Sequence, residues 1–274
     1  MSGHESGEIV ISFEGVTLGF DEGDILRRVS FSVARQETKV LVGETGAGKT
    51  LALKLAAGLL RPDAGRVEVL GHNVSGMSES ELLGFRQKIG FVFQEGALFD
   101  SLAVEDNVAY RLREDGVDEN EIEGRVREAL RFVEMEHAIG LIPSELSGGM
   151  RRRVSIARAL VNRPPVVLYD SPTAGLDPVT AQTIITLILR LRDTYGVTAL
   201  LATHRLQDAF ALANFRFDPA ANRVVPAKQN GRPWAGSVSA ATSFLVLRDG
   251  SVYFEGDQRA VLQSPDPYLK RFLV

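Results

Sequence analysis

The sequence predicts an α/β fold in which helices cover a parallel β-sheet. Three observations support this fold class. A glycine-rich stretch lies between a strand-like apolar run at residues 40–42 and a helix-like run at residues 51–57. Residues 166–170 are four apolar residues closed by an aspartate, which is typical of a central parallel strand buried on both faces. Residues 103–161 are mostly helical in pattern and have the charge density of a solvated helical subdomain.

Hydrophobic periodicity and turn residues assign the other elements. Residues 9–20 and 29–33 alternate apolar and polar side chains, as half-buried antiparallel strands do, and residues 21–24 are expected to form the turn between them. Residues 217–239 have no clear periodicity and are predicted to form a long loop or an insertion. Further strands are predicted at residues 66–70, 88–93, 197–202, 244–247 and 251–254, and helices at residues 79–86, 119–134, 154–161, 180–192 and after Asp257.

The glycine-rich stretch has the pattern of a phosphate-binding P-loop, G-x-x-x-x-G-K-T. Its residues are Gly43, Glu44, Thr45, Gly46, Ala47, Gly48, Lys49 and Thr50. The glycines let successive N–H groups point inward, and the following helix directs its positive end at the same anion. Lys49 can reach the β- and γ-phosphates, and the Thr50 hydroxyl can ligate Mg²⁺. Because both flanks and the Lys-Thr pair fit, a chance glycine-rich loop is disfavoured, and a nucleoside triphosphate is the predicted ligand.

Two further motifs point to the same chemistry. Asp170 ends a buried strand more than a hundred residues after the P-loop, where a Walker B carboxylate holds Mg²⁺. Ser147 can cap a helix whose first residues are Gly148 and Gly149, so a phosphate could approach exposed N–H groups there. One nucleotide needs only one such helix start, so a head-to-tail pair of chains would use both. The basic run at residues 151–153 is interpreted as a solvated basic face.

Composition bounds the remaining function classes. The chain has 274 residues, 45% of them hydrophobic and 24% charged, as in an ordinary soluble globular protein. The net charge of −4 gives no support for nucleic-acid binding through a general basic field. No cysteine occurs, which excludes disulfides and Cys-ligated metal. We expect no transmembrane helix and no signal peptide, because no 18-residue apolar run occurs and the start of the chain is polar and acidic, so a cytosolic ATP consumer is expected.

The motifs, taken in order, resemble those of ABC-type ATPase subunits along nearly the whole chain. They are Phe20, the P-loop, Gln94, Leu-Ser-Gly-Gly at residues 146–149, the strand ending at Asp170, Gly-Leu-Asp at residues 175–177, and His204. The resemblance implies a P-loop NTPase fold with a RecA-like core and an antiparallel β subdomain at residues 1–93 and 162–274. It also implies an α-helical signature subdomain inserted at residues 94–161.

The same resemblance implies a role for each residue that it matches. Phe20 is expected to stack on adenine, and Gln94 to sense Mg²⁺ and the attacking water while relaying the nucleotide state to a membrane partner. Asp177 is expected to shape the seam of a homodimer, and His204 to contact the γ-phosphate. A Gln, a His or a strand-end Phe standing alone would more simply be structural, so these roles depend on the accompanying motifs.

A finer resemblance is to the MCE-associated, Mla-type ATPases of lipid transport. It depends on Met150 where Gln is commoner, on Phe-Gln-Glu-Gly-Ala-Leu-Phe-Asp at residues 93–100, on Asn-Val-Ala-Tyr at residues 107–110, and on Ser-Pro-Asp-Pro at residues 264–267. This resemblance implies a homodimer at the cytoplasmic face of the inner membrane, below an integral membrane permease. There it would move phospholipid with an MCE-domain lipid-binding protein.

The sequence departs from the family pattern at Ser171, where a glutamate is expected to polarise the attacking water. A serine hydroxyl is far too weak a base near neutral pH, and general-base catalysis contributes roughly 10²–10⁴-fold. Hydrolysis is therefore expected to be slow unless another group, such as His204, substitutes. Two alternatives stay open: a nucleotide-gated regulatory subunit with dispensable hydrolysis, and an ABC ATPase for another substrate. A soluble ABC protein that acts on ribosomes or DNA is disfavoured by the single half-site and the acidic charge.

Overall fold

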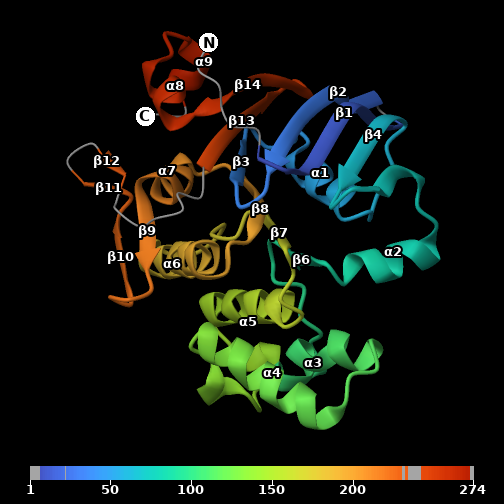
Figure 1. Cartoon of the computed structure of the whole chain (residues 1–274), viewed down its shortest axis with the longest axis vertical. Helices are drawn as coiled ribbons and strands as arrows, with labels where there is room; N and C mark the ends of the chain where they lie inside the picture. The colour runs from blue at the N-terminus through green and yellow to red at the C-terminus, as the bar shows by residue number, and fades with distance from the viewer. Residues whose placement is uncertain (1–6, 22, 230–231, 234–241, 272–274) are drawn as a thin grey trace.

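Two β-sheets form the framework of the computed structural model, which describes residues 7–21, 23–229, 232–233 and 242–271 (Figure 1). The larger sheet has the order β14 (Ser251–Asp257), β13 (Thr242–Arg248), β3 (Thr38–Val42), β8 (Thr198–Thr203), β7 (Val166–Asp170) and β6 (Ile89–Val92). Neighbouring strands in this sheet are parallel, except that the edge strand β14 is antiparallel to β13. The smaller sheet is antiparallel, with the order β2 (Gly23–Ala34), β1 (Ile9–Phe20), β4 (Ala64–Val69) and β5 (His72–Asn73). The predicted α/β class and the antiparallel first sheet are confirmed.

Helices cover both faces of the parallel sheet (Figure 1). Helix α1 lies between the two sheets, whereas α6 and α7 lie on the other face and α3, α4 and α5 form a separate helical group beyond β6 and β7. Their bounds are α1 Lys49–Ala56, α2 Glu79–Arg86, α3 Val104–Glu114, α4 Glu119–Phe132, α5 Gly148–Leu160, α6 Pro178–Tyr195, α7 Leu206–Asn214, α8 Gln258–Gln263 and α9 Pro267–Arg271. Among the described residues, no helix combines the length and the apolar character that crossing a bilayer requires.

The parallel sheet separates two hydrophobic cores. On β3, Val40 and Val42 face the core that contains α3 to α7, whereas Leu41 between them faces the core shared with α1 and the antiparallel sheet. On β7, Val167 and Tyr169 face the first core while Val166 and Leu168 face the second. Successive side chains of a strand point to opposite faces, so a strand between two cores must be apolar throughout. The run at residues 166–170 is therefore buried on both faces, as predicted.

Capping side chains fix several helix starts. Ser78 and Glu81 form a reciprocal capping box at α2, and Asp257 accepts from Ala260 N at 2.8 Å to cap α8, as the sequence predicts. Asp177 accepts from the backbone N–H groups of Val179 and Thr180, both at 3.0 Å, at the start of α6. Each cap satisfies donors that a helix start leaves unpaired.

The loop alternative for residues 217–239 and the solvated basic face at residues 151–153 are wrong, whereas the insertion alternative for residues 217–239 stays a prediction. Residues 217–239 are not a plain loop where they are described, because β9 (Phe215–Asp218) and β10 (Arg223–Pro226) form an antiparallel pair. Phe217 is buried on this pair, and its N–H donates to Asp193 Oδ2 at 2.6 Å. Strands of four residues are too short to produce readable periodicity. Short strands β11 (Lys228–Gln229) and β12 (Arg232–Pro233) follow, and residues 230–231 and 234–239 lie outside the described part.

The second error concerns the basic run at residues 151–153, which is not a solvated face. Arg152 is only 6% exposed, and its guanidinium donates to Phe93 O at 3.0 Å. Arg151 donates to Leu146 O at 2.6 Å, and Arg153 also reaches a backbone carbonyl. Smaller differences are that β2 is longer than predicted, that residues 72–73 pair as β5, and that the tail contains α9.

Candidate nucleotide site

The predicted site residues follow neighbouring strands at one edge of the parallel sheet. In the register, Val42 at the end of β3 pairs with Thr203 on β8, and Asp170 at the end of β7 pairs with Ala202. The carboxyl ends of parallel strands share one edge of the sheet. The P-loop after β3, Asp170 at the end of β7, His204 after β8 and Gln94 after β6 therefore all lie at this edge. Ligands of open α/β sheets bind at this edge.

The P-loop glycines are required by backbone conformation and by close approach. Gly46 and Gly48 have φ of 84° and 92°, in the left-handed region that favours glycine. A Cβ at Gly48 would lie 2.3 Å from the Leu26 side chain, and a Cβ at Gly43 would lie 2.4 Å from Leu247 O. Gly48 is also the N-cap of α1, which has no side-chain cap and no acid in its first turn. The loop therefore leaves the positive helix start available to an anion, which fits a phosphate.

Lys49 is the cation of this loop. It is 9% exposed, and its ammonium donates to the carbonyl oxygens of Gly43 and Glu44, each at 2.8 Å. Burial lowers the pKa of Lys49, and the nearby Asp170 carboxylate opposes that shift. The chain thus holds a partly desolvated ammonium against its own loop, where a phosphate would gain a charge-assisted bond.

Thr50 and Asp170 meet across the edge of the sheet. The Thr50 hydroxyl donates to Asp170 Oδ1 at 3.0 Å, and Asp170 is 5% exposed. Burial raises the pKa of Asp170, against the hydrogen bond from Thr50 and the charges of Lys54, Lys49 and Arg152. Within the described residues no cluster of three or more His, Cys, Asp or Glu could hold a metal on its own. One hydroxyl and one carboxylate beside a phosphate seat fit Mg²⁺, which usually binds one or two carboxylates plus substrate phosphates.

Ser171, directly after Asp170, has an uncommon backbone conformation. Its φ is 46°, it is 9% exposed, and its N–H donates to Ala202 O at 2.9 Å. Its own carbonyl accepts from Ala174 N at 3.0 Å and from the Arg152 guanidinium at 3.5 Å. A left-handed residue other than glycine costs free energy and persists only where its surroundings hold it. These backbone bonds hold Ser171 in place beside Asp170.

The other predicted site residues, Gln94, His204, Asp177 and Phe20, are all exposed. Gln94 and His204 are exposed and follow β6 and β8 at the same edge. Asp177 is exposed and caps α6, a structural task that by itself accounts for an aspartate at this position. Phe20 is 56% exposed and pairs with Gly23 at the tip of the β1–β2 hairpin. Asp24 of the same hairpin lines a cavity with P-loop residues 44–47, so part of the hairpin that carries Phe20 reaches the P-loop, although Phe20 itself does not line this cavity.

The predicted second phosphate-binding helix start is the first turn of α5. Ser147 caps it by accepting from Met150 N at 3.2 Å, and Ser147 and Gly148 are exposed. A Cβ at Gly149 would lie 2.4 Å from Thr180 Cγ2, so the close packing of α5 on α6 requires glycine there. Figure 1 shows α5 and α1 on different sides of β6 and β7. The two helix starts therefore belong to different parts of the chain's surface.

Sequence reasoning missed two residue groups that organise the site. Arg152 ties α5 to the loop before Gln94 through Phe93 O, and burial lowers the pKa of Arg152. Helical spacing gave a signal, because Arg152 lies three and four residues before the fully buried Ser155 and Ile156.

The second missed group joins the segments that carry Ser171 and His204. The buried Thr173 hydroxyl donates to Asp208 Oδ2, and the Arg205 guanidinium lies 3.7 Å from that same oxygen. Burial raises the pKa of Asp208, against the hydrogen bond from Thr173. No local sequence pattern predicts the hydrogen bond between Thr173 and Asp208, because the two residues lie 35 positions apart in the chain.

Sequence comparisons identify relatives of this chain. The sequence profile of the ABC transporter family matches residues 26–174. Over 250 residues the chain is 32% identical to the intermembrane phospholipid transport system ATP-binding protein MlaF of Escherichia coli K12, covering 91% of this chain and 82% of MlaF. Over 183 residues it is 42% identical to the methionine import ATP-binding protein MetN 1 of Listeria monocytogenes, covering 67% of this chain. The chain spans about half the length of this MetN relative, 54%.

Solved structures give the same result for the fold. The dimeric ATP-binding cassette MJ0796 in a post-hydrolysis state, bound to ADP and Pi, matches with a TM-score of 0.73 and 28% identity over 90% of this chain and 98% of that one. The cassette cbiO1 of Clostridium perfringens, part of the ABC transporter complex cbiONQ, matches with a TM-score of 0.74 at 23% identity over 97% of this chain and 100% of that one. The second likeness concerns the fold alone.

Proposed function

Because the chain belongs to the ABC transporter family as an ABC-type ATPase, we propose that it binds ATP–Mg²⁺, pairs with a second copy and drives a membrane permease. The observation that carries this proposal is the Thr50–Asp170 pair beside the buried Lys49, at the edge of the sheet where the P-loop begins. The exposed start of α5 supports the homodimer, because it offers phosphate-directed N–H groups that the chain's own P-loop does not need.

Each predicted site residue contacts a particular part of the bound nucleotide in this proposal. The N–H groups of the P-loop and the Lys49 ammonium hold the phosphates, and Thr50 and Asp170 hold Mg²⁺ together with Gln94. Bound Mg²⁺ supplies charge neutralisation at the phosphates. Phe20 stacks on adenine, His204 contacts the γ-phosphate, and Asp177 lies at the dimer seam with the partner's signature residues, which correspond to Ser147, Gly148 and Gly149.

Hydrolysis by this chain is proposed to be slow because Ser171 lacks a carboxylate. Its position beside Asp170 and its buried backbone bonds support the view that residue 171 faces the reaction region. We expect Ser171→Glu to raise steady-state ATP turnover by roughly 10²–10⁴-fold, the usual contribution of a general base. Ser171→Gln is the matched control, because it has the size of Glu without a base, and it should leave turnover low. Equal turnover in wild type and Ser171→Glu would refute this role.

A second candidate function is a nucleotide-gated regulatory subunit whose hydrolysis is dispensable, and Ser171 is the observation that favours it. The two candidates differ in the complex reconstituted with its membrane partner. If the chain is the motor, Lys49→Ala abolishes transport and Ser171→Glu accelerates it. If the chain is regulatory, both wild type and Ser171→Glu assemble with the membrane partner in an ATP-dependent way. The two then transport at the same rate, although their rates of ATP turnover differ.

The proposed substrate class is phospholipid, in a system of the MCE/Mla type at the cytoplasmic face of the inner membrane. Its support is that similarity to MlaF extends over 91% of the chain, whereas the more identical MetN match covers 67%. Import of another substrate is the alternative. The decisive measurement is co-purification of the permease and its companion proteins from membranes. Recovery of an MCE-domain protein and transfer of labelled phospholipid are expected, and recovery of a methionine-binding partner would overturn the lipid assignment.

A cavity lined by Phe93, the residue before Gln94, supports a membrane partner. This cavity of about 370 Å³ is lined by aromatic residues that include Phe91, Phe93, Phe99 and Tyr110. Phe99 and Tyr110 are 42% and 41% exposed, and their ring centroids lie 4.6 Å apart. Exposed aromatic clusters of this kind mark interaction sites.

Asn107 fixes the loop that carries Phe99. It is fully buried, accepts from Phe99 N at 2.7 Å and donates to Phe99 O at 3.1 Å. If the permease docks here, Tyr110→Ala weakens co-purification of the permease, whereas Leu262→Ala at an exposed apolar residue of α8 leaves it unchanged. Equal recovery with both variants would move the docking surface elsewhere.

A further inference from the structure

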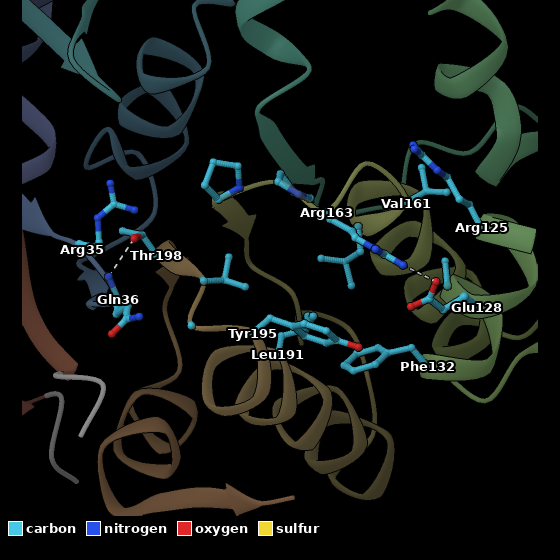
Figure 2. A pocket seen from close by; sticks show the side chains of 16 residues that line it. Arg35, Gln36, Arg125, Glu128, Phe132, Val161, Arg163, Leu191, Tyr195 and Thr198 are labelled. Carbon is cyan, nitrogen blue, oxygen red and sulfur yellow. Dashed lines mark hydrogen bonds and ion pairs between the residues drawn. The ribbon is translucent and has the colours of Figure 1, made fainter. Parts of the chain in front are cut away.

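A cavity of about 360 Å³ lies at the edge of the parallel sheet opposite the P-loop (Figure 2). Its wall includes Pro165, just before β7, and Thr198, the first residue of β8, whereas Asp170 and Thr203 end those strands at the nucleotide edge. Helices α4, α5 and α6 and the segments that connect β2 to β3, α5 to β7 and α6 to β8 contribute the rest of the wall, so the cavity lies where the helical group meets the sheet. Its volume falls within the range of about 300–1,000 Å³ that is usual for small-molecule sites.

The interior of this cavity is apolar. Val161 and Leu191 are 4% and 3% exposed, and both line it. At its mouth Tyr195 is 57% exposed, with its ring 5.8 Å from that of the buried Phe132 (Figure 2). The Arg190 guanidinium lies over the Phe132 ring, 4.6 Å from its centroid, in a cation–π contact. A large apolar side chain left exposed beside an apolar cavity indicates a binding surface.

The rim of the cavity is cationic. Arg35, Arg125 and Arg163 line it together with one carboxylate, Glu128. Figure 2 shows Arg35 on one side of the cavity and Arg125 and Arg163 on the other. Each guanidinium pairs with an exposed carboxylate, and these partners are Glu8, Glu121 and Glu128. Exposed ion pairs contribute little to stability, so a ligand anion can replace such a partner at small cost.

We propose that this cavity binds a small amphipathic carboxylate, with its apolar body against Val161 and Leu191 and its carboxylate against the guanidinium groups of Arg125 and Arg163. A planar guanidinium matches a carboxylate through two parallel hydrogen bonds. The apolar walls select against small inorganic anions, which would leave them uncovered. This site goes beyond the proposed nucleotide chemistry and does not depend on it, because binding is measured without ATP.

The test is calorimetric titration of the full chain with decanoate, and with 1-decanol as its uncharged counterpart. We expect decanoate to bind at least ten times more tightly than 1-decanol. Arg163→Gln should weaken decanoate binding about tenfold and leave 1-decanol binding unchanged. Arg127→Gln is the matched control, because Arg127, like Arg163, is an exposed arginine paired with one glutamate but lies outside the cavity, and it should bind decanoate like wild type.

A second variant tests the apolar walls. Ala129 is 8% exposed and lines the cavity, so Ala129→Trp should fill the cavity and abolish binding of both probes. Circular dichroism and retained ATP binding verify that this variant folds. Equal affinities for decanoate and 1-decanol, no binding by wild type, or equal loss with Arg163→Gln and Arg127→Gln would each overturn the proposal. Arg163 is exposed, so its variant stays informative even if Ala129→Trp does not fold.

Discussion

The two helix starts that could face phosphate, those of α1 and α5, are built in opposite ways. The start of α1 has a left-handed Gly48 and no side-chain cap, and a buried Lys49 with the Thr50–Asp170 pair stands beside it. The start of α5 is exposed and capped by Ser147. The guanidinium of Arg151, in the first turn of α5, donates a hydrogen bond to Leu146 O. The start of α1 has a buried cation and a hydroxyl–carboxylate pair beside it, whereas the start of α5 has only backbone N–H groups and a hydroxyl. This difference supports the proposal that the P-loop binds nucleotide within its own chain, whereas the start of α5 serves the nucleotide of a second chain.

We expect the largest effect from removing the cation at the start of α1. Lys49→Ala should weaken ATP binding about 100-fold, because a charged hydrogen-bond donor contributes up to about 3 kcal/mol. Titration of the chain with ATP–Mg²⁺ measures this loss. Lys88→Ala at an exposed lysine away from the loop is the control and should bind like wild type. Unchanged affinity in Lys49→Ala would mean that α1 alone, without its cation, holds the phosphates.

We expect a smaller effect from a substitution at the start of α5, and this effect should leave the nucleotide affinity of the single chain unchanged. Gly149→Ala forces a Cβ to within 2.4 Å of Thr180 Cγ2, and overpacking of this kind costs about 1–3 kcal/mol of unfolding free energy. Urea unfolding measures that cost. ATP affinity of the single chain should stay unchanged, while ATP-dependent dimerisation, measured by light scattering, should weaken.

The matched control for Gly149→Ala is Gly124→Ala on α4. A Cβ there meets nothing within 4 Å, so this variant should gain about 0.5–1 kcal/mol of stability and dimerise normally. Equal stability changes in the two variants, or a loss of ATP affinity in Gly149→Ala, would contradict the separation of the two helix starts.

The smallest effect is a pH dependence confined to the α1 side. Burial raises the pKa of Asp170, and Mg²⁺ requires its charged form, so the Mg²⁺-dependent part of ATP affinity should fall at a higher pH than for an ordinary aspartate. The sign for stability is opposite: the raised pKa favours the folded state below the unfolded pKa, and that contribution is lost as the pH rises through the folded value.

Titrations at several pH values check this dependence. The loss of affinity should approach about tenfold per pH unit below the pKa, and Asp170→Asn should abolish the difference between titrations with and without Mg²⁺. The residues at the α5 start, Ser147, Gly148 and Gly149, have no group that titrates in this range. A pH slope that persists in Asp170→Asn would assign the titration to another group.

Local and periodic signals predicted most of the framework. The strand ending at Asp170 and the helix after it are predictable because a strand between two cores is apolar throughout and an amphipathic helix repeats its pattern over several turns. The P-loop is predictable because its glycines, Lys49 and Thr50 are adjacent in the chain. Contacts between distant segments were not predictable in the same way, as with Thr173 and Asp208. The burial of Arg152 was readable from helical spacing but was outweighed by its charged neighbours.

Backbone conformation was the other source of error. Nothing in the residue type announces that Ser171 is left-handed, because serine seldom adopts that conformation and tertiary hydrogen bonds impose it. The pair β9–β10 was missed because each strand spans only four residues, which is too short for alternation to stand out from a loop. Tertiary hydrogen bonds decided the first case, and the shortness of the strands decided the second.

The division of the interior into two cores has a consequence for the precision of the nucleotide edge. A slip of β3 or β7 by one residue would exchange every side chain between the cores, placing Leu41 where Val40 and Val42 pack and Tyr169 among the smaller residues around α1. Both faces resist that slip at once, so the strands are held in register from two sides. Gly43 and Asp170 each lie at or directly after the end of such a strand, and their spacing is set by packing several residues away.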